Sequence, residues 1–301
     1  MTILASPQEK AELLTAAAVQ GRSLWEDARR RLLRNKAAVG SMILLAIITL
    51  AAVFGPLVWP HHYDTIYYDR VLIEPTLENF HIIGTDPQGR DQFVRLLYGL
   101  RVSLAVGIVA TLVSLVIGVI WGAVAGYSGG QIDQIMMRIV DVLYSLPFIF
   151  FVIILMVVFG RNIILIFVAI GAVEWLTMAR IVRGQTISLR RKEFVEAAEA
   201  AGVGTPQIVS RHIIPNVLGP VVVYVTLTIP AVILAESFLS FLGLGVQEPL
   251  TSLGRLISTG AQEMETAPWL LIYPAITMMV TLFCFNFIGD GLRDAIDPKD
   301  R

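Results

Sequence analysis

Long apolar runs constrain this chain more than any other feature. A helix needs about 20 apolar residues to cross the hydrocarbon core of a bilayer. Of the 301 residues, 55% are hydrophobic and only 16% are charged, which is less charge than a soluble domain of this length carries. Six stretches reach or approach the required length, and they are residues 38–60, 103–127, 140–159, 163–178, 218–238 and 269–287. The sequence therefore predicts an all-α, polytopic membrane protein with six transmembrane helices.

Lysine and arginine predict how the chain is oriented in the membrane. Six crossings place both termini on the same side, and with the N-terminus in the cytoplasm 17 of the 23 basic residues fall in cytoplasmic segments. We therefore expect a cytoplasmic segment 1–37, an outer loop 61–100, a core 101–290 with a cytoplasmic loop 181–216, and a cytoplasmic tail 291–301. The arginine-rich stretch 29–34 predicts an amphipathic helix on the cytoplasmic leaflet, or is only an orientation signal.

One polar segment, residues 190–216, stands between two of these spans. Four of its apolar residues recur at helical spacing and predict an apolar stripe on a short helix. That stripe consists of Phe194, Ala197, Ala198 and Ala201. Gly202 predicts the helix end, because glycine adopts the left-handed conformation at little cost, and Thr205 with Pro206 is typical of the N-cap and first turn of a second helix. The segment is either a plain connecting loop or a docking site for another protein.

The sequence contains no recognisable nucleotide or metal site. None of the four lysines lies in a phosphate-binding loop pattern. His61 and His62 are adjacent in the outer loop, while His81 and His212 are isolated, so we expect no metal-ligand cluster and no cofactor bound by this chain. The net charge of −1 gives no general attraction for nucleic acid. If the protein moves a solute uphill, the energy comes from an ion gradient or from a separate ATPase.

The polar segment resembles the EAA loop of ABC-importer permeases. The residues that carry this resemblance are Glu196, Ala197, Ala198, Gly202 and Pro215, at the spacing of the family pattern. That pattern has Ile and Leu three and one residues before the proline, where this chain has His212 and Ile214. The resulting RHIIPN, residues 211–216, is similar to the RHILPN form usual in peptide permeases.

The resemblance extends over nearly the whole chain. Its motifs are IIGTDPQGRDQFVRLLYGLRVSL (82–104), SFLSFLGLGVQEP (237–249), FNFIGDGLRDAIDPKDR (285–301) and the N-terminal GRSLWEDARRRLLRNKAAV (21–39). Together they resemble the C-type permease subunit of oligopeptide importers. The resemblance implies a type I ABC importer permease fold in the bacterial inner membrane, with loop 61–100 in the periplasm. It also implies three kinds of partner besides membrane lipid: a homologous B-type permease subunit, two cytosolic ATPase subunits that bind ATP and Mg²⁺, and a periplasmic peptide-binding protein.

The same resemblance implies roles for individual residues. The helix with Glu196, Ala197 and Ala198, and with Glu193 on its charged side, would be the coupling helix that docks into an ATPase subunit. Gly202 would supply its sharp elbow. Pro215 would break the second short helix where the chain re-enters the membrane. Glu199 is expected to be a solvent-exposed charge of little consequence.

Other polar and small residues have weaker predicted roles. Gly118, Gly122 and Gly126 predict close helix packing, within this chain or against a second permease. Asp86 and Asp91 indicate helix capping rather than a cation site, and Asp141 indicates packing or capping. Glu174 and Glu236 are candidate residues of the translocation path that meet the charged termini of a peptide.

Two other classes of function stay open at this stage. An ion-driven secondary transporter would show inverted repeats and broken helices with polar residues at mid-membrane, and a membrane-embedded enzyme would need clustered catalytic groups. Neither pattern is evident. Within the favoured class, permeases for dipeptides, nickel or antimicrobial peptides are the closest alternatives.

Overall fold

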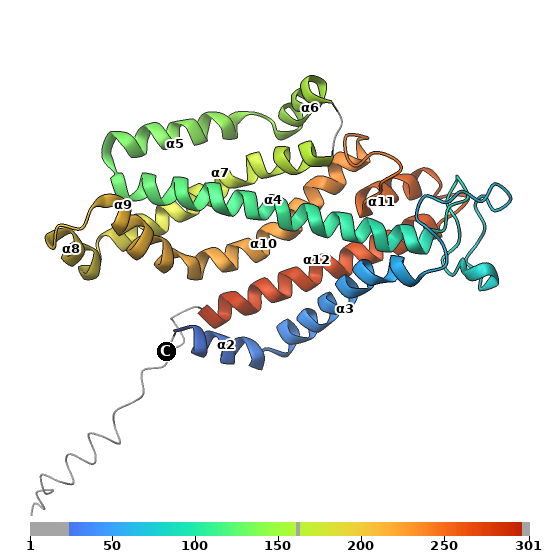
Figure 1. Ribbon diagram of the computed structural model, residues 1–301, viewed down its shortest axis with the longest axis horizontal. Coiled ribbons are helices and arrows are strands. Elements are labelled where there is room, and N and C mark those ends of the chain that lie inside the picture. Colours follow the sequence, from blue (N-terminus) through green and yellow to red (C-terminus); the bar gives the residue numbers. More distant parts are fainter. Residues whose placement is uncertain (1–23, 161–162, 297–301) are drawn as a thin grey trace, which may run out of the picture.

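Helices make up all the regular structure that the computed structural model describes, which covers residues 24–160 and 163–296 (Figure 1). This confirms the all-α prediction. The longer helices are α2 (Leu24–Arg34), α3 (Lys36–Val58), α4 (Gln92–Ser128), α5 (Gly130–Ser145), α6 (Phe148–Phe159), α7 (Ile163–Arg190), α10 (Ile214–Phe241), α11 (Leu253–Gln262) and α12 (Trp269–Ile296). The predicted N-terminal segment and tail lie partly outside the described residues, at 1–23 and 297–301.

Four helical runs among the described residues are long and apolar enough to cross a membrane. They are α3, α4, the run Thr205–Phe241 that includes α10, and α12. The consecutive helices α5 and α6 add a fifth if the bent pair is one span. The remaining predicted crossing, α7, is not among them, so the number six stays a prediction.

The third predicted span, residues 140–159, is wrong as a single helix. The chain bends by 84° between α5 and α6. Leu146 adopts an extended conformation at φ −75°, ψ 128°, because Pro147 disfavours the helical region for the residue before it. The proline was visible in the sequence and marks the break.

The helix expected after Asp91 is the start of α4, which begins at Gln92 and continues without a break through the predicted span 103–127. Asp91 caps this helix, with its Oδ1 accepting a hydrogen bond from the Val94 N–H at 2.9 Å. The capping prediction for Asp91 is therefore confirmed. Asp86 also accepts backbone N–H bonds, from Gln88 and Arg90, both at 2.9 Å.

A glycine seam joins α4 to α7 along their length. A Cβ built on Gly122 would lie 2.4 Å from the Ala179 carbonyl oxygen, and one on Gly126 would lie 2.8 Å from that of Arg183. Such distances leave no room for a side chain. The glycines therefore allow close packing of helices within this chain, which was the first of their two predicted roles.

The predicted basic helix at the N-terminus is α2, which lies beside the end of α12 in Figure 1. Asn35 separates it from α3 and caps α3 through hydrogen bonds from the N–H groups of Ala37 and Ala38. Gly291 of α12 lies against Ala38, so the elbow between α2 and α3 is held on α12.

Candidate functional site

The predicted docking segment is a short helix and a glycine turn at one end of the bundle (Figure 1). We call residues 193–203, which contain α8 (Glu193–Ala200), the α8 knob. Gly202 has φ +77° and its N–H bonds to the Glu199 carbonyl, while the Val203 N–H bonds to the Ala198 carbonyl. This is the Schellman pattern of helix ends, so the predicted helix end at Gly202 is confirmed.

The faces of α8 differ from the predicted stripe. Val195 is fully buried and Ala198 is 9% exposed, so these two residues seat the helix on the bundle. Phe194, which was predicted to share the stripe with Ala198, is 42% exposed, and Ala197 is exposed beside it. Neighbouring helical residues only 100° apart can face the bundle or the solvent, and tertiary contact decides which.

Glu199 is exposed, as expected, but it also bonds the α8 knob to α4, which the expectation of a charge without consequence did not include. The Tyr127 hydroxyl donates a 2.8 Å hydrogen bond to Glu199 Oε1. The guanidinium of Arg190 lies 5.6 Å from the centre of the Tyr127 ring. Glu193 and Glu196 are likewise exposed, in the first turn of α8.

The second helix of the segment starts and ends differently from the prediction. Its N-cap is Gly204, one residue before Thr205, and no side chain caps it. Pro215 does not break the helix, because a π-helical turn at Val209–Ile213 leads directly into α10 and places the proline in the first turn of α10.

The opposite end of the bundle is covered by two loops, residues 59–91 and 242–252, which we call the loop cap. A buried ionic cluster joins them. Asp86 contacts Arg90 Nε at 2.7 Å and Arg95 Nε at 3.3 Å, and Glu248 of the second loop pairs with Arg90. The side chains of Asp86, Arg90 and Arg95 are at most 6% exposed.

Charge pairing sets the ionisation of this cluster. Burial disfavours the charged Arg90, yet its contacts with Glu248 and Asp86 raise the pKa of Arg90 above the usual arginine value. Burial likewise acts to raise the pKa of Glu248, but Arg90 and Arg95 outweigh it and lower that pKa. Both groups are therefore held in their charged forms.

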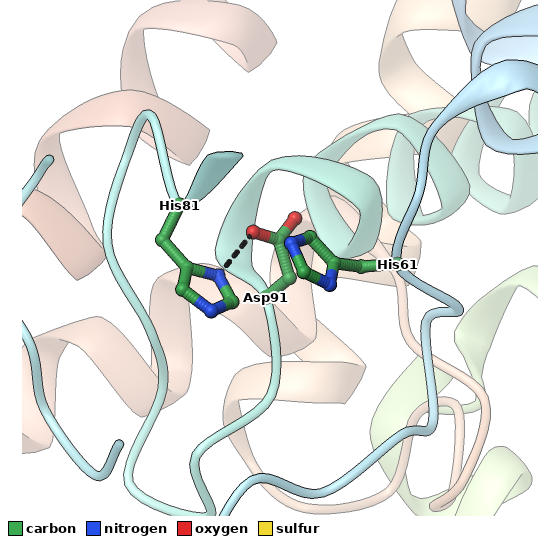
Figure 2. Close-up of side chains that lie close together, drawn as sticks. All are labelled: His61, His81 and Asp91. Atoms are coloured by element: carbon green, nitrogen blue, oxygen red, sulfur yellow. Dashed lines mark hydrogen bonds and ion pairs between the residues drawn. The ribbon is translucent and has the colours of Figure 1, made fainter. Parts of the chain in front are cut away.

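Two histidines and an aspartate gather in the loop cap, where sequence reasoning treated His81 as isolated (Figure 2). The rings of His61 and His81 are stacked, with centres 4.4 Å apart and planes 14° from parallel. His81 Nδ1–H donates to Asp91 Oδ2 at 2.8 Å. A metal ion must lie in the plane of each imidazole that binds it, and stacked rings share no such plane.

The remaining ring nitrogens also have partners. Arg70 Nη1 donates to His81 Nε2 at 3.2 Å. His61 accepts from the Tyr67 hydroxyl at 2.8 Å and donates to the Asn79 carbonyl at 2.6 Å. The group is therefore a hydrogen-bonded network that fixes the first loop onto the start of α4, rather than a metal centre.

Two family descriptions match this chain. Residues 93–301 match "Binding-protein-dependent transport system inner membrane component" and residues 23–75 match "N-terminal TM domain of oligopeptide transport permease C". The first match covers more than half of the chain. The chain belongs to the family of binding-protein-dependent transport system inner membrane components. It is thus a multi-pass inner-membrane permease subunit.

Individual relatives of this permease are similar over nearly their whole length. The Oligopeptide transport system permease protein OppC of Haemophilus influenzae is 55% identical, over 98% of this chain and 94% of the relative. The protein of the same name in Escherichia coli K12 is 58% identical, over 94% of each. The Dipeptide transport system permease protein DppC of Bacillus subtilis is 45% identical, over 93% of this chain and 87% of the relative.

A solved structure gives the fold class of the permease. The chain is similar to one in the inward-facing MetNI methionine ABC transporter, with a TM-score of 0.56 and 20% identity, over 67% of this chain and 96% of that one. At this identity the likeness concerns the fold alone. It confirms the predicted type I ABC importer permease fold.

The permease holds its two predicted pathway acids in different surroundings. Glu236 is fully buried, and accepts hydrogen bonds from Ser103 at 3.3 Å and Ser240 at 2.6 Å. Those contacts join α10 to α4 and give Glu236 a structural role. Glu174 on α7 is partly exposed. A place on the pathway stays a prediction for both.

Sequence reasoning missed the charged contacts between α5 and α7 of the permease. Asp141, expected to pack or cap, pairs with Arg180 at 2.8 Å. Asp133 pairs with Arg183 at 2.5 and 2.6 Å. The sequence carried no signal for these pairs, because Arg138 lies only three residues from Asp141 and would have been the nearer basic partner.

Proposed function

We propose that this chain is a permease subunit of an ATP-driven importer that carries oligopeptides across the inner membrane. The observation that carries the proposal is similarity at 55–58% identity, over at least 94% of the chain, to relatives named as oligopeptide permease subunits. At this identity and coverage, the chain and these relatives share both their helices and the loops that connect them.

In this proposal, the α8 knob couples transport to ATP hydrolysis. Phe194, Ala197 and Glu196 are exposed on a helix anchored from below by Val195 and Glu199. An exposed apolar surface beside a carboxylate suits a cleft with a basic residue, since a charge-assisted hydrogen bond adds to apolar contact. Ala198 contributes by seating the helix, while Glu193 lies at the exposed rim.

The turn residues would transmit force between the ATPase and the span. Gly202 sets the direction in which α8 leaves the bundle. Pro215 lies where the second short helix continues into α10, with no break between them. A push on α8 would therefore pass through the turn at 201–204 and then along the continuous helical run Thr205–Phe241 that contains α10. ATP binding would shift the permease between two states only if the permease contacts the ATPase differently in each state.

The partners follow from the same proposal. A homologous B-type permease subunit would complete the pathway, two cytosolic ATPase subunits would bind ATP and Mg²⁺, and a periplasmic binding protein would deliver the peptide. Both termini and the α8 knob would be cytoplasmic, with the loop cap in the periplasm. This orientation agrees with the distribution of basic residues.

The first test is purification of the tagged chain from its native membrane in mild detergent. We expect stoichiometric recovery of a second permease subunit and two ATPase subunits, followed by peptide-stimulated ATP hydrolysis after reconstitution with the binding protein. Recovery of the chain alone, or of a homodimer without ATPase, would overturn the coupling proposal and favour an ion-driven transporter.

A dipeptide permease is the second candidate, because the Bacillus subtilis relative named for dipeptide transport is 45% identical. Uptake of an alanine series from two to six residues separates the two. Oligopeptide import predicts uptake of the tri- to hexapeptides, whereas a dipeptide permease would take up only the shortest member.

A further inference from the structure

The charged side chains between α5 and α7 line a hollow of about 850 Å³ on the surface of the bundle. Two ion pairs line it, Arg183 with Asp133 and Arg180 with Asp141. Arg138 also lines it and has no ion-pair partner among the residues that the structure describes. This hollow is separate from the α8 knob and the loop cap.

The two ion pairs differ in how open they are. The two arginines are similarly exposed, with Arg183 at 35%, but the Asp133 side chain is only 12% exposed and both of its oxygens accept hydrogen bonds from Arg183, so this pair is a closed contact on its acidic side. The side chains of Arg180 and Asp141 are 39% and 55% exposed and share a single 2.8 Å contact. The second pair is therefore accessible to a ligand.

The open pair lies beside exposed apolar residues of α4 and α5. Gly122 of α4 packs against Ala179 and Arg183 of α7, which places Arg180 level with Gly122, within about two turns of the end of α4 at Ser128. At that height α4 exposes Ile120, which is 54% exposed. On α5, Ile139 lies two residues before Asp141 and is 43% exposed.

An exposed ion pair beside the apolar surface of spanning helices is costly if it faces lipid. It is tolerated where it faces water or protein, and in an importer the water-filled space between the spans is the substrate pathway. The pair also presents both signs of charge, and so does a peptide with free termini. Tyr144 offers Arg180 a further contact, with the guanidinium 4.2 Å from the ring centre.

We propose that Arg180 and Asp141 line the translocation pathway and exchange their mutual ion pair for the carboxylate and ammonium groups of a passing peptide. The proposal rests on the peptide-import function above. An exchange of partners leaves no charge unpaired, so it avoids the penalty of a bare charge in a poorly solvated site. Arg138 supplies an additional cation for acidic groups.

The test compares uptake of Ala-Glu-Ala and Ala-Lys-Ala by the complete transporter in proteoliposomes. Arg180→Gln and Asp141→Asn break the same ion pair, so a purely structural role predicts equal losses for both peptides. A pathway role predicts opposite changes. We expect Arg180→Gln to lower the ratio of acidic to basic peptide uptake by about tenfold and Asp141→Asn to raise it by a similar factor, on the scale of one charge-assisted contact.

Arg183→Gln is the matched control, since it breaks the closed pair on the same helix and is expected to leave the ratio unchanged. Arg180→Lys keeps the charge and should restore the ratio. Parallel changes in Arg180→Gln and Asp141→Asn, or an unchanged ratio in both, would overturn the pathway assignment. Failure of the unaltered transporter to import either peptide would instead overturn the proposed function.

Discussion

The two ends of the bundle satisfy their polar groups in different ways. The loop cap pairs its charges internally, with the side chains of Asp86, Arg90 and Arg95 nearly inaccessible and with each ring nitrogen of His61 and His81 bonded. The α8 knob is anchored by Val195, Ala198 and one hydrogen bond from Tyr127, and it leaves its apolar side open. A closed end of this kind is complete by itself, whereas the open end has a surface that another protein can cover.

The sharpest test of this contrast is Gly202→Asp in the α8 knob. At φ +77° an aspartate is strained by about 1–2 kcal/mol, and relief of that strain would redirect α8. We expect loss of transport with normal membrane insertion and a normal loop cap, measured by uptake and by protein level in the membrane.

Gly204→Asp is the matched control for that substitution. Gly204 has φ −68° and is the N-cap of the next helix, a position that aspartate favours. Transport in this variant should stay near the unaltered level. Equal loss in both variants would indicate that added charge, and not backbone conformation, is responsible.

In the loop cap the largest effect is expected from Asp86→Ala. The change leaves the buried Arg90 and Arg95 with the partly exposed Glu248 as their remaining acidic partner, and removal of one partner from a buried ionic cluster typically destabilises a protein by about 3–5 kcal/mol. A lower midpoint of thermal unfolding in detergent would report this. Asp69→Ala provides the control, because Asp69 is 80% exposed and should change the midpoint little.

A smaller effect is expected where the α8 knob meets α4. Tyr127→Phe removes one hydrogen bond to Glu199, worth about 1 kcal/mol. Because this bond is among the few that seat α8, we expect a several-fold fall in transport with little change in thermal stability. A fall in stability without a change in transport would mean that the bond serves only the fold.

The smallest effect concerns acid pH. The pKa of Glu248 is lowered in the folded protein, so its contribution to stability is complete above its unfolded pKa of about 4.5 and is lost as the pH falls through the folded value. Glu248→Gln should therefore remove a part of the acid-induced loss of loop-cap stability, measured by thermal unfolding between pH 3 and 7. The same pH profile in both proteins would contradict this role.

Local sequence signals predicted the positions of most features at both ends. Gly202 ends its helix and Asp91 caps α4 as expected, because both effects operate within four residues. Three errors were also local: Pro147 breaks a span taken as one helix, Gly204 replaces Thr205 as the cap, and Pro215 is accommodated without a break. The accommodation of Pro215 depends on a π-helical turn that no residue pattern predicts.

The apolar runs, the helix ends and the resemblance to peptide permeases are properties of the sequence alone, because each is read from neighbouring or regularly spaced residues. Only the tertiary structure decided which charges pair. Arg180 and Asp141 are 39 residues apart and Arg90 and Glu248 are 158 apart. Such contacts depend on how helices and loops are placed relative to one another. The same placement turned Phe194 outward and Val195 inward, although both are apolar neighbours on one helix.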